Sequence, residues 1–166
     1  SEVLLAGWVH SRRDHGGVLF IDLRDREGIT QVVFSPEADA ALHERATHLR
    51  GEWVIGVRGR GRARPGGAGK PKIPTGAIEV LAHELRVLNP SATPPFPIED
   101  QVTADESIRL RHRYLDLRRP AMAKNLVFRS RVVSFMRSFL TERGFLEVET
   151  PFLTKSTPEG ARDYLV

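Results

Sequence analysis

The sequence contains no cysteine, and this absence excludes disulfide bonds and thiolate metal sites. Histidine is also scarce, at six of 166 residues. His43 and His48 are separated by five positions in a stretch of helical pattern, so they fall on different faces of that helix. The sequence therefore predicts no metal site.

Long apolar runs are also absent. No run approaches the ~18 apolar residues of a membrane span, and no signal peptide opens the chain. We therefore expect a cytoplasmic protein with no membrane contact. The chain starts one residue before a strand-like run and stops inside an apolar stretch, which predicts a piece of a longer protein. An apolar share of 40% is still enough to bury a core.

Basic residues slightly outnumber acidic ones, 25 to 21, and this leaves a net charge of +4. Such an excess favours an anionic partner without naming one. Two basic runs stand out, one at 58–72 and one at 109–119. In the first, the alternate arginines of a strand would share one face, which suits a phosphate backbone. A solvated surface is the alternative interpretation of either run.

Alternating apolar and polar residues predict five strands in the first part of the chain, at 3–13, 18–24, 29–34, 53–64 and 78–88. Asp14 to Gly17 is typical of a hairpin turn. Pro36 to Arg50 has a helical pattern, with Ser35 placed to cap it. Three strands, a helix and two strands are the order of a five-stranded OB-fold β-barrel. A small sandwich with an inserted helix is the competing architecture.

A proline-rich segment divides the chain. We predict an OB-fold domain over residues 1–90, a hinge over 91–106 and the beginning of an α/β domain over 107–166. In the last part, 107–117 can form a helix and 125–142 predicts a long amphipathic helix ended by Gly144. A short strand is expected at 145–150, closed by Pro151.

Phe20 is the most informative residue of the predicted barrel. It shares the polar face of its strand with Asp22 and Arg24, while Leu19 and Ile21 supply the core. OB folds use such exposed aromatics to stack unpaired bases. The alternative is a phenylalanine that the adjacent helix or linker covers.

Two polar strand residues could join Phe20. Gln31 offers both a donor and an acceptor to a base edge, and Glu79 could accept a hydrogen bond from an exocyclic amine. Taken alone, each is more often an ordinary solvated side chain. The second half shows no phosphate-binding glycine loop, nucleophile elbow or paired metal carboxylates, so no catalytic residue is predicted.

Several strings resemble a known family. GWVHSRRD (7–14), FIDLRD (20–25) and QVV (31–33) are similar to the anticodon-binding domain of class IIb aminoacyl-tRNA synthetases. YLDLRR (114–119) resembles the segment that opens their catalytic domain, and GFLEVETP (144–151) resembles class II motif 1. TPEGARDYLV (157–166) is similar to the loop after motif 1 in the bacterial aspartyl members and separates them from the asparaginyl and lysyl ones.

The resemblance implies an aspartate–tRNA ligase as the parent enzyme, which joins L-aspartate to tRNA(Asp) with ATP and Mg²⁺. Motifs 2 and 3 are not in these 166 residues, so we expect no activity from the chain alone. The alternatives are a stand-alone OB-fold RNA-binding module without ligase activity, and an asparaginyl or archaeal-type relative.

The same resemblance implies roles for five barrel residues. Phe20 would stack on an anticodon base and Gln31 would read the central uridine. Three further residues would complete the anticodon pocket, namely Arg13, Arg64 and Glu79.

Four other residues receive roles in the same way. His15 and Gly67 resemble the pattern of relaxed enzymes that also charge tRNA(Asn). Glu159 would bind the α-ammonium group of aspartate, and Pro151 would lie at a homodimer interface.

Overall fold

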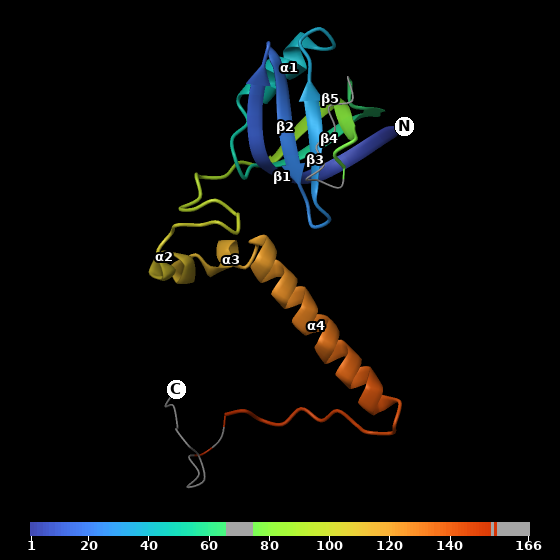
Figure 1. The fold of residues 1–166 in the computed structure, drawn as a ribbon, viewed down its shortest axis with the longest axis vertical. Helices are drawn as coiled ribbons and strands as arrows, with labels where there is room; N and C mark the ends of the chain where they lie inside the picture. The colour runs from blue at the N-terminus through green and yellow to red at the C-terminus, as the bar shows by residue number, and fades with distance from the viewer. Residues whose placement is uncertain (66–74, 154, 156–166) are drawn as a thin grey trace. The chain divides into compact units, whose positions relative to one another are not determined.

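The computed structural model describes residues 1–65, 75–153 and 155. The chain divides into two compact units, Ser1–Pro95 and Phe96–Val166. The first unit contains the strands β1 (Glu2–His15), β2 (Val18–Arg24), β3 (Ile29–Phe34), β4 (Val54–Ala63) and β5 (Ile78–Asn89), together with the helix α1 (Ala40–Thr47) (Figure 1). The second contains the helices α2 (Glu106–Arg111), α3 (Arg113–Asp116) and α4 (Pro120–Thr141).

The five strands close into a barrel in the order β1-β2-β3-β5-β4. Neighbouring strands are antiparallel except β3 and β5, which pair in parallel through Val32 with Val80 and Val33 with Leu81. The predicted OB-fold barrel is therefore confirmed, and the sandwich is excluded. Closure matters for the site because it places β3 beside β5, although α1 and β4 separate them in the sequence.

The alternation of β2 divides the barrel into an inside and an outside. Leu19, Ile21 and Leu23 are buried in the core, while Phe20 and Asp22 are only partly buried on the other face. Together with α1, the inward residues form one apolar cluster: Val9, Leu19, Ile21, Leu23, Val32, Phe34, Leu42, Ala46, Leu49, Ile55, Val57, Ala82 and Leu85. The face assignment made from the sequence is correct.

Two glycines allow the strands to approach closely. A Cβ atom on Gly7 would lie 2.3 Å from the carbonyl oxygen of Arg24, and one on Gly59 would lie 2.5 Å from that of Leu81. Gly59 also stands where the register between β4 and β5 shifts. Any side chain there would collide with backbone, so the barrel needs glycine at both positions.

The helix of the barrel is shorter than predicted, and its cap is a different residue. The α1 helix starts at Ala40, and the side chain of Asp39 accepts a hydrogen bond from the Leu42 amide at 2.9 Å. The carbonyl of Ser35 instead accepts bonds from the amides of Ala38 and Asp39. The predicted Ser35 cap and the start at Pro36 are wrong, because a separate turn occupies those residues.

The hairpin between β1 and β2 turns at Gly16 and Gly17, whose φ angles are 61° and 80°. Positive φ at both central residues is the requirement of a type I′ turn. Asp14 supports the turn by accepting a hydrogen bond from the Gly17 amide at 3.1 Å. The predicted hairpin at 14–17 is confirmed.

In the second unit, the long helix begins five residues before the predicted start at Asn125, since α4 opens at Pro120. Proline needs no hydrogen bond at the first helical turn, and the Asp100 carboxylate accepts from the Ala121 amide at 2.9 Å. Gly144, with a φ of 81°, follows its end as expected. The strand predicted at 145–150 is wrong: those residues carry no strand, and a strand requires a paired neighbour.

Candidate nucleic-acid interface

A pocket of about 670 Å³ opens on the outer face of the barrel. Its walls come from β2, β3, β4 and β5 and from the turn before α1. The lining residues are Val18, Phe20, Gln31, Val33, Ser35, Glu37, Ala38, Arg62, Arg64, Pro65, Glu79 and Leu81. Apolar and polar side chains are therefore mixed in a cavity large enough for a flat organic group.

Phe20 supplies the aromatic part of this pocket. Its neighbours Leu19 and Ile21 point into the core, and side chains alternate along a strand, so its ring lies on the outer face. The ring is half-buried, and Glu37 and Ala38 from the turn before α1 line the same pocket. The turn before α1 therefore forms part of the pocket wall and leaves the ring of Phe20 partly exposed.

A row of polar side chains crosses all five strands beside Phe20. The strand register pairs Ser11 with Asp22, Asp22 with Gln31, and Arg62 with Glu79. A hydrogen bond from Gln31 Nε2 to Glu79 Oε2 at 3.2 Å joins the two halves of the row. Gln31 and Glu79 are only 5% and 3% exposed, so this bond lies at the buried centre of the row.

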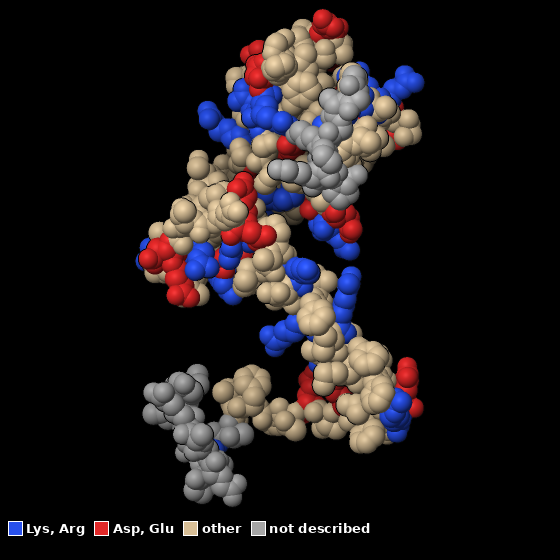
Figure 2. Space-filling model, in the orientation of Figure 1, with Lys and Arg blue, Asp and Glu red and all other residues tan. Residues whose placement is uncertain are grey.

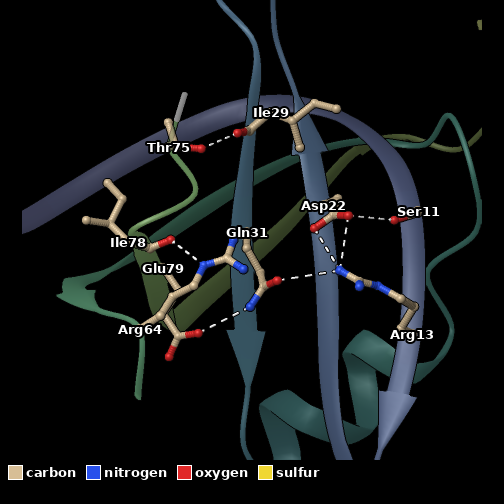
Figure 3. Close-up of polar contacts among 9 residues, drawn as sticks. All are labelled: Ser11, Arg13, Asp22, Ile29, Gln31, Arg64, Thr75, Ile78 and Glu79. Atoms are coloured by element: carbon tan, nitrogen blue, oxygen red, sulfur yellow. Dashed lines mark hydrogen bonds and ion pairs between the residues drawn. The ribbon is translucent and has the colours of Figure 1, made fainter. Parts of the chain in front are cut away.

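Both ends of the row are held by charged contacts. Arg62 Nε donates to Glu79 Oε1 at 2.8 Å, and Ser11 Oγ donates to Asp22 Oδ2 at 3.0 Å. Arg13 bridges the gap, since its Nη2 lies 3.0 Å from Asp22 Oδ1 and 3.5 Å from Gln31 Oε1 (Figure 3). The Oε1 atom of Gln31 therefore faces a donor, and its Nε2 atom faces an acceptor.

Arg64 follows β4 and differs from the other pocket residues. Its Nε donates to the Ile78 carbonyl at 3.0 Å, as Figure 3 shows. Its Nη2 is buried, and no acceptor within the described parts of the chain reaches it. A buried donor without a partner is costly, and Arg64 is one of the residues that line the pocket.

The alternating arginines of β4 share a face, but acids neutralise two of them. Arg58 Nε lies 3.5 Å from Glu84, and Arg62 lies 2.8 Å from Glu79. Figure 2 accordingly shows basic and acidic side chains interspersed over the barrel. The face is therefore less strongly positive than the sequence alone suggests.

The structure brings together the five residues that the sequence predicted for the anticodon pocket. Phe20, Gln31, Arg64 and Glu79 line the cavity, and Arg13 contacts Gln31 beside it. Asp22 and Arg62 also belong to this network and were not predicted from the sequence. The period of two along β2 and β4 could have found them, since each shares a strand face with a predicted site residue.

The remaining predicted residues lie elsewhere or outside the described residues. His15 is exposed at the end of β1, beside the hairpin turn, and does not line the pocket. Pro151 is exposed in a segment that is neither helix nor strand. Gly67 and Glu159 both lie outside the described residues.

The second unit contains a buried carboxylate, Asp116, which was not predicted from the sequence. Asp116 has no exposed surface and accepts hydrogen bonds from Arg113 and, at 2.8 Å, from Arg119, with Arg109 at 3.9 Å. Burial by itself raises the pKa of this carboxyl, but the hydrogen bond from Arg119 and the three positive charges outweigh it and lower the pKa. Asp116 thus forms ion pairs with three arginines of the basic run at 109–119, namely Arg109, Arg113 and Arg119.

The structure adds two general observations. Among the residues it describes, no group of three or more histidine, aspartate or glutamate side chains could hold a metal ion. No helix within the same residues is long and apolar enough to cross a membrane.

Comparisons with known proteins agree with this geometry. A family model described as "OB-fold nucleic acid binding domain" matches residues 3–88, and one described as "tRNA synthetases class II (D, K and N)" matches residues 105–166. The Aspartate--tRNA(Asp/Asn) ligase of Desulfosudis oleivorans is 60% identical over the whole chain. That of Dehalococcoides mccartyi strain 195 is 58% identical, also over the whole chain. The chain spans 28% of the length of each of these relatives.

Two solved structures are similar to the chain. The asparaginyl-tRNA synthetase of Pyrococcus horikoshii has a TM-score of 0.80 and 27% identity, and the match covers 96% of this chain and 35% of that one. The aspartyl tRNA synthetase of Entamoeba histolytica has a TM-score of 0.82 over 94% of this chain and 38% of its own, and at 20% identity it shows the fold alone. The chain therefore belongs to the OB-fold nucleic acid binding domain family, and its residues from 105 onward match the model of the class II tRNA synthetases (D, K and N).

Proposed function

We propose that this chain recognises the anticodon of tRNA as part of an aspartate–tRNA ligase. The observation that carries the proposal is the convergence of Phe20, Gln31, Arg64 and Glu79 in one pocket on the outer face of an OB barrel. The ligase names of relatives that are 57–60% identical support an enzyme rather than a stand-alone RNA-binding module.

The pocket offers the two kinds of contact that an unpaired base requires. The half-buried ring of Phe20 provides a stacking surface, worth roughly 1–3 kcal/mol per base. The amide of Gln31 keeps one N–H and one oxygen lone pair beyond its bonds to Glu79 and Arg13, and these would read the central uridine. Stacking provides affinity, and the amide provides the choice of base.

Three charged residues would complete the pocket. The unpaired Nη2 of Arg64 would donate to a base or phosphate oxygen. Glu79 would accept from an exocyclic amine with the lone pairs that Arg62 and Gln31 leave free. Arg13 lies on the open side of the network with 46% of its side chain exposed, where it could meet a phosphate group.

We propose relaxed specificity, so that the enzyme accepts both tRNA(Asp) and tRNA(Asn). The relatives named above are called Aspartate--tRNA(Asp/Asn) ligases, which supports this choice. His15 and Gly67 are the residues we assign to it. His15 is exposed at the hairpin, where a tRNA could reach it.

The remaining roles concern the ligase as a whole. Glu159 would bind the α-ammonium group of L-aspartate, while ATP and Mg²⁺ would activate the substrate carboxylate, and no residue of this chain is assigned to them. Pro151 would lie at a homodimer interface in a cytoplasmic enzyme. Apolar side chains exposed on α4 support a second copy as the partner of this region: Leu126, Val127, Phe128, Val132, Phe135, Met136, Phe139 and Leu140.

Calorimetric binding of the chain to anticodon stem-loops tests the proposal. We expect the GUC loop of tRNA(Asp) and the GUU loop of tRNA(Asn) to bind with similar affinity, and an unrelated loop to bind at least about tenfold more weakly. The measurement is repeated at two salt concentrations, because phosphate contacts weaken with salt for every loop alike. Equal binding of all three loops, following salt alone, would contradict anticodon recognition.

A strong preference for GUC over GUU would keep the anticodon proposal and remove only the relaxed specificity. Ligase activity is tested separately, by aminoacylation with the complete enzyme that contains this chain. An enzyme that binds both loops but attaches no aspartate to tRNA would contradict the ligase assignment.

A further inference from the structure

The amide of Gln31 has opposite hydrogen-bonding roles at its two ends, and its neighbours distinguish them. Its oxygen faces Arg13 Nη2 at 3.5 Å, and its nitrogen donates to Glu79 Oε2 at 3.2 Å. An arginine only donates, whereas a carboxylate only accepts. Turning the amide by half a rotation would set donor against donor and acceptor against acceptor. One order of the two atoms is therefore strongly favoured.

The neighbours are themselves held in place. Arg13 Nη2 lies 3.0 and 3.1 Å from the two oxygens of Asp22, so a charge pair fixes the donor that meets Gln31. On the other side, Arg62 Nε binds Glu79 Oε1 at 2.8 Å, which leaves Oε2 for Gln31. Gln31 is 5% exposed, and in such a buried setting these contacts are stronger than in water.

The order of oxygen and nitrogen decides which pyrimidine an amide can read. Uracil carries a donor at N3 and an acceptor at O4, whereas cytosine carries an acceptor at N3 and a donor at N4. The two bases therefore require opposite orders of the same amide. An amide that can turn serves both bases, and an amide that cannot turn serves one.

We infer that Asp22 and Glu79 are positioning residues that hold the amide of Gln31 in one order, so that the pocket selects uracil over cytosine. Asp22 acts through Arg13, and Glu79 acts by direct contact with Gln31. This inference rests on the proposed function, because it assumes that Gln31 reads a base. It extends that function by naming how the choice between two pyrimidines is made.

Two variants test the inference, with calorimetric affinities for stem-loops that carry GUC or GCC. Asp22→Asn removes the charge that holds Arg13. In Glu79→Gln, Arg62 holds the oxygen of the new amide, whose NH₂ then faces Gln31 and favours the reverse order. We expect the unaltered chain to prefer GUC by at least about tenfold, and each variant to reduce this ratio at least about fivefold.

Glu84→Gln is the matched control. Glu84 lies on β5 like Glu79, but it pairs with Arg58 at 3.5 Å and does not line the pocket. The control removes the same charge and should strengthen the binding of both loops alike, so its ratio should stay within about twofold of the unaltered chain. Thermal unfolding checks that each variant folds, and if Glu79→Gln does not, Asp22→Asn decides alone.

The two possible failures are distinguishable. If the unaltered chain binds GUC and GCC equally, base reading by Gln31 is wrong, and the positioning role is wrong with it. If the unaltered chain prefers GUC and the folded variants keep its ratio, the positioning role is wrong while the proposed function stands.

Discussion

Gln31 on β3 donates a hydrogen bond to Glu79 on β5 across 3.2 Å, although 48 positions separate the two residues in the sequence. Little of either residue is exposed, and both line the pocket that Phe20 also lines. The parallel pairing of β3 with β5 produces this contact. The candidate site therefore depends on barrel closure as much as on its residues.

Replacement of Phe20 tests the stacking surface. Phe20→Ala should weaken binding of the GUC stem-loop by about 1–3 kcal/mol, because the base loses its stacking partner. Phe20→Trp should preserve most of the affinity, since it keeps an aromatic face. Leu4→Ala is the control, because Leu4 is 70% exposed and does not line the pocket. Calorimetry measures the affinities, and unchanged binding of the Phe20→Ala chain would disprove the stacking role.

Replacement of Arg64 tests the unpaired donor in the pocket. Arg64→Met should weaken stem-loop binding by about 1.5–3 kcal/mol, the usual value of a hydrogen bond that involves a charged group. Arg58→Met is the matched control, since it removes the same charge from a residue that pairs with Glu84 outside the pocket. Equal losses in the two variants would mean that Arg64 acts only through its charge.

The glycines of β4 make a test of the barrel itself. Gly59→Ala should lower the free energy of unfolding by about 1–3 kcal/mol, because its Cβ would lie 2.5 Å from the Leu81 carbonyl oxygen. Gly56→Ala, on the same strand, meets nothing closer than 3.9 Å and should change stability by less than about 0.5 kcal/mol. Urea denaturation measures both, and similar values would contradict the close approach of β4 and β5.

Glu52 has an unusual backbone conformation and forms an ion pair with Arg24. Its φ is 63°, which is uncommon for a residue other than glycine, and its carboxylate accepts two hydrogen bonds from Arg24 at 2.9 and 2.6 Å. A double-mutant cycle of Glu52→Ala and Arg24→Ala should give a coupling of about 0.5–3 kcal/mol in the free energy of unfolding. A coupling near zero would show that the pair contributes nothing to stability.

Asp116 should make the helical unit sensitive to acid. The pKa of Asp116 is lower in the folded state than in the unfolded state. Between these two pKa values the unfolded state binds more protons, so the free energy of unfolding rises with pH. The stabilisation is complete above the unfolded pKa of about 3.9 and is lost as the pH falls through the folded value. Asp116→Asn should reduce the helical circular dichroism at neutral pH and make its loss in acid smaller. An identical acid profile in both proteins would contradict this role.

Much of the fold was predictable because its signals are local. The alternation of Leu19, Phe20 and Ile21 assigns the faces of β2, and two adjacent glycines produce the hairpin turn. The cap of α1 was not predictable in this way, since Ser35 and Asp39 are both good capping residues. The helix that starts after Asp39 buries Leu42 and Ala46 in the core of the barrel, and this packing is a tertiary contact.

The sequence by itself determined the order of strands and helices, the side of each strand that enters the core, and the residue types available for a base-binding pocket. Only the tertiary structure decided which of those residues meet. Closure of the barrel aligns Asp22, Gln31 and Glu79 in one row, and it leaves Arg64 Nη2 buried without an acceptor in the described residues. Periodicity along a strand is a local property, whereas contact between strands depends on register and closure, which no single segment contains.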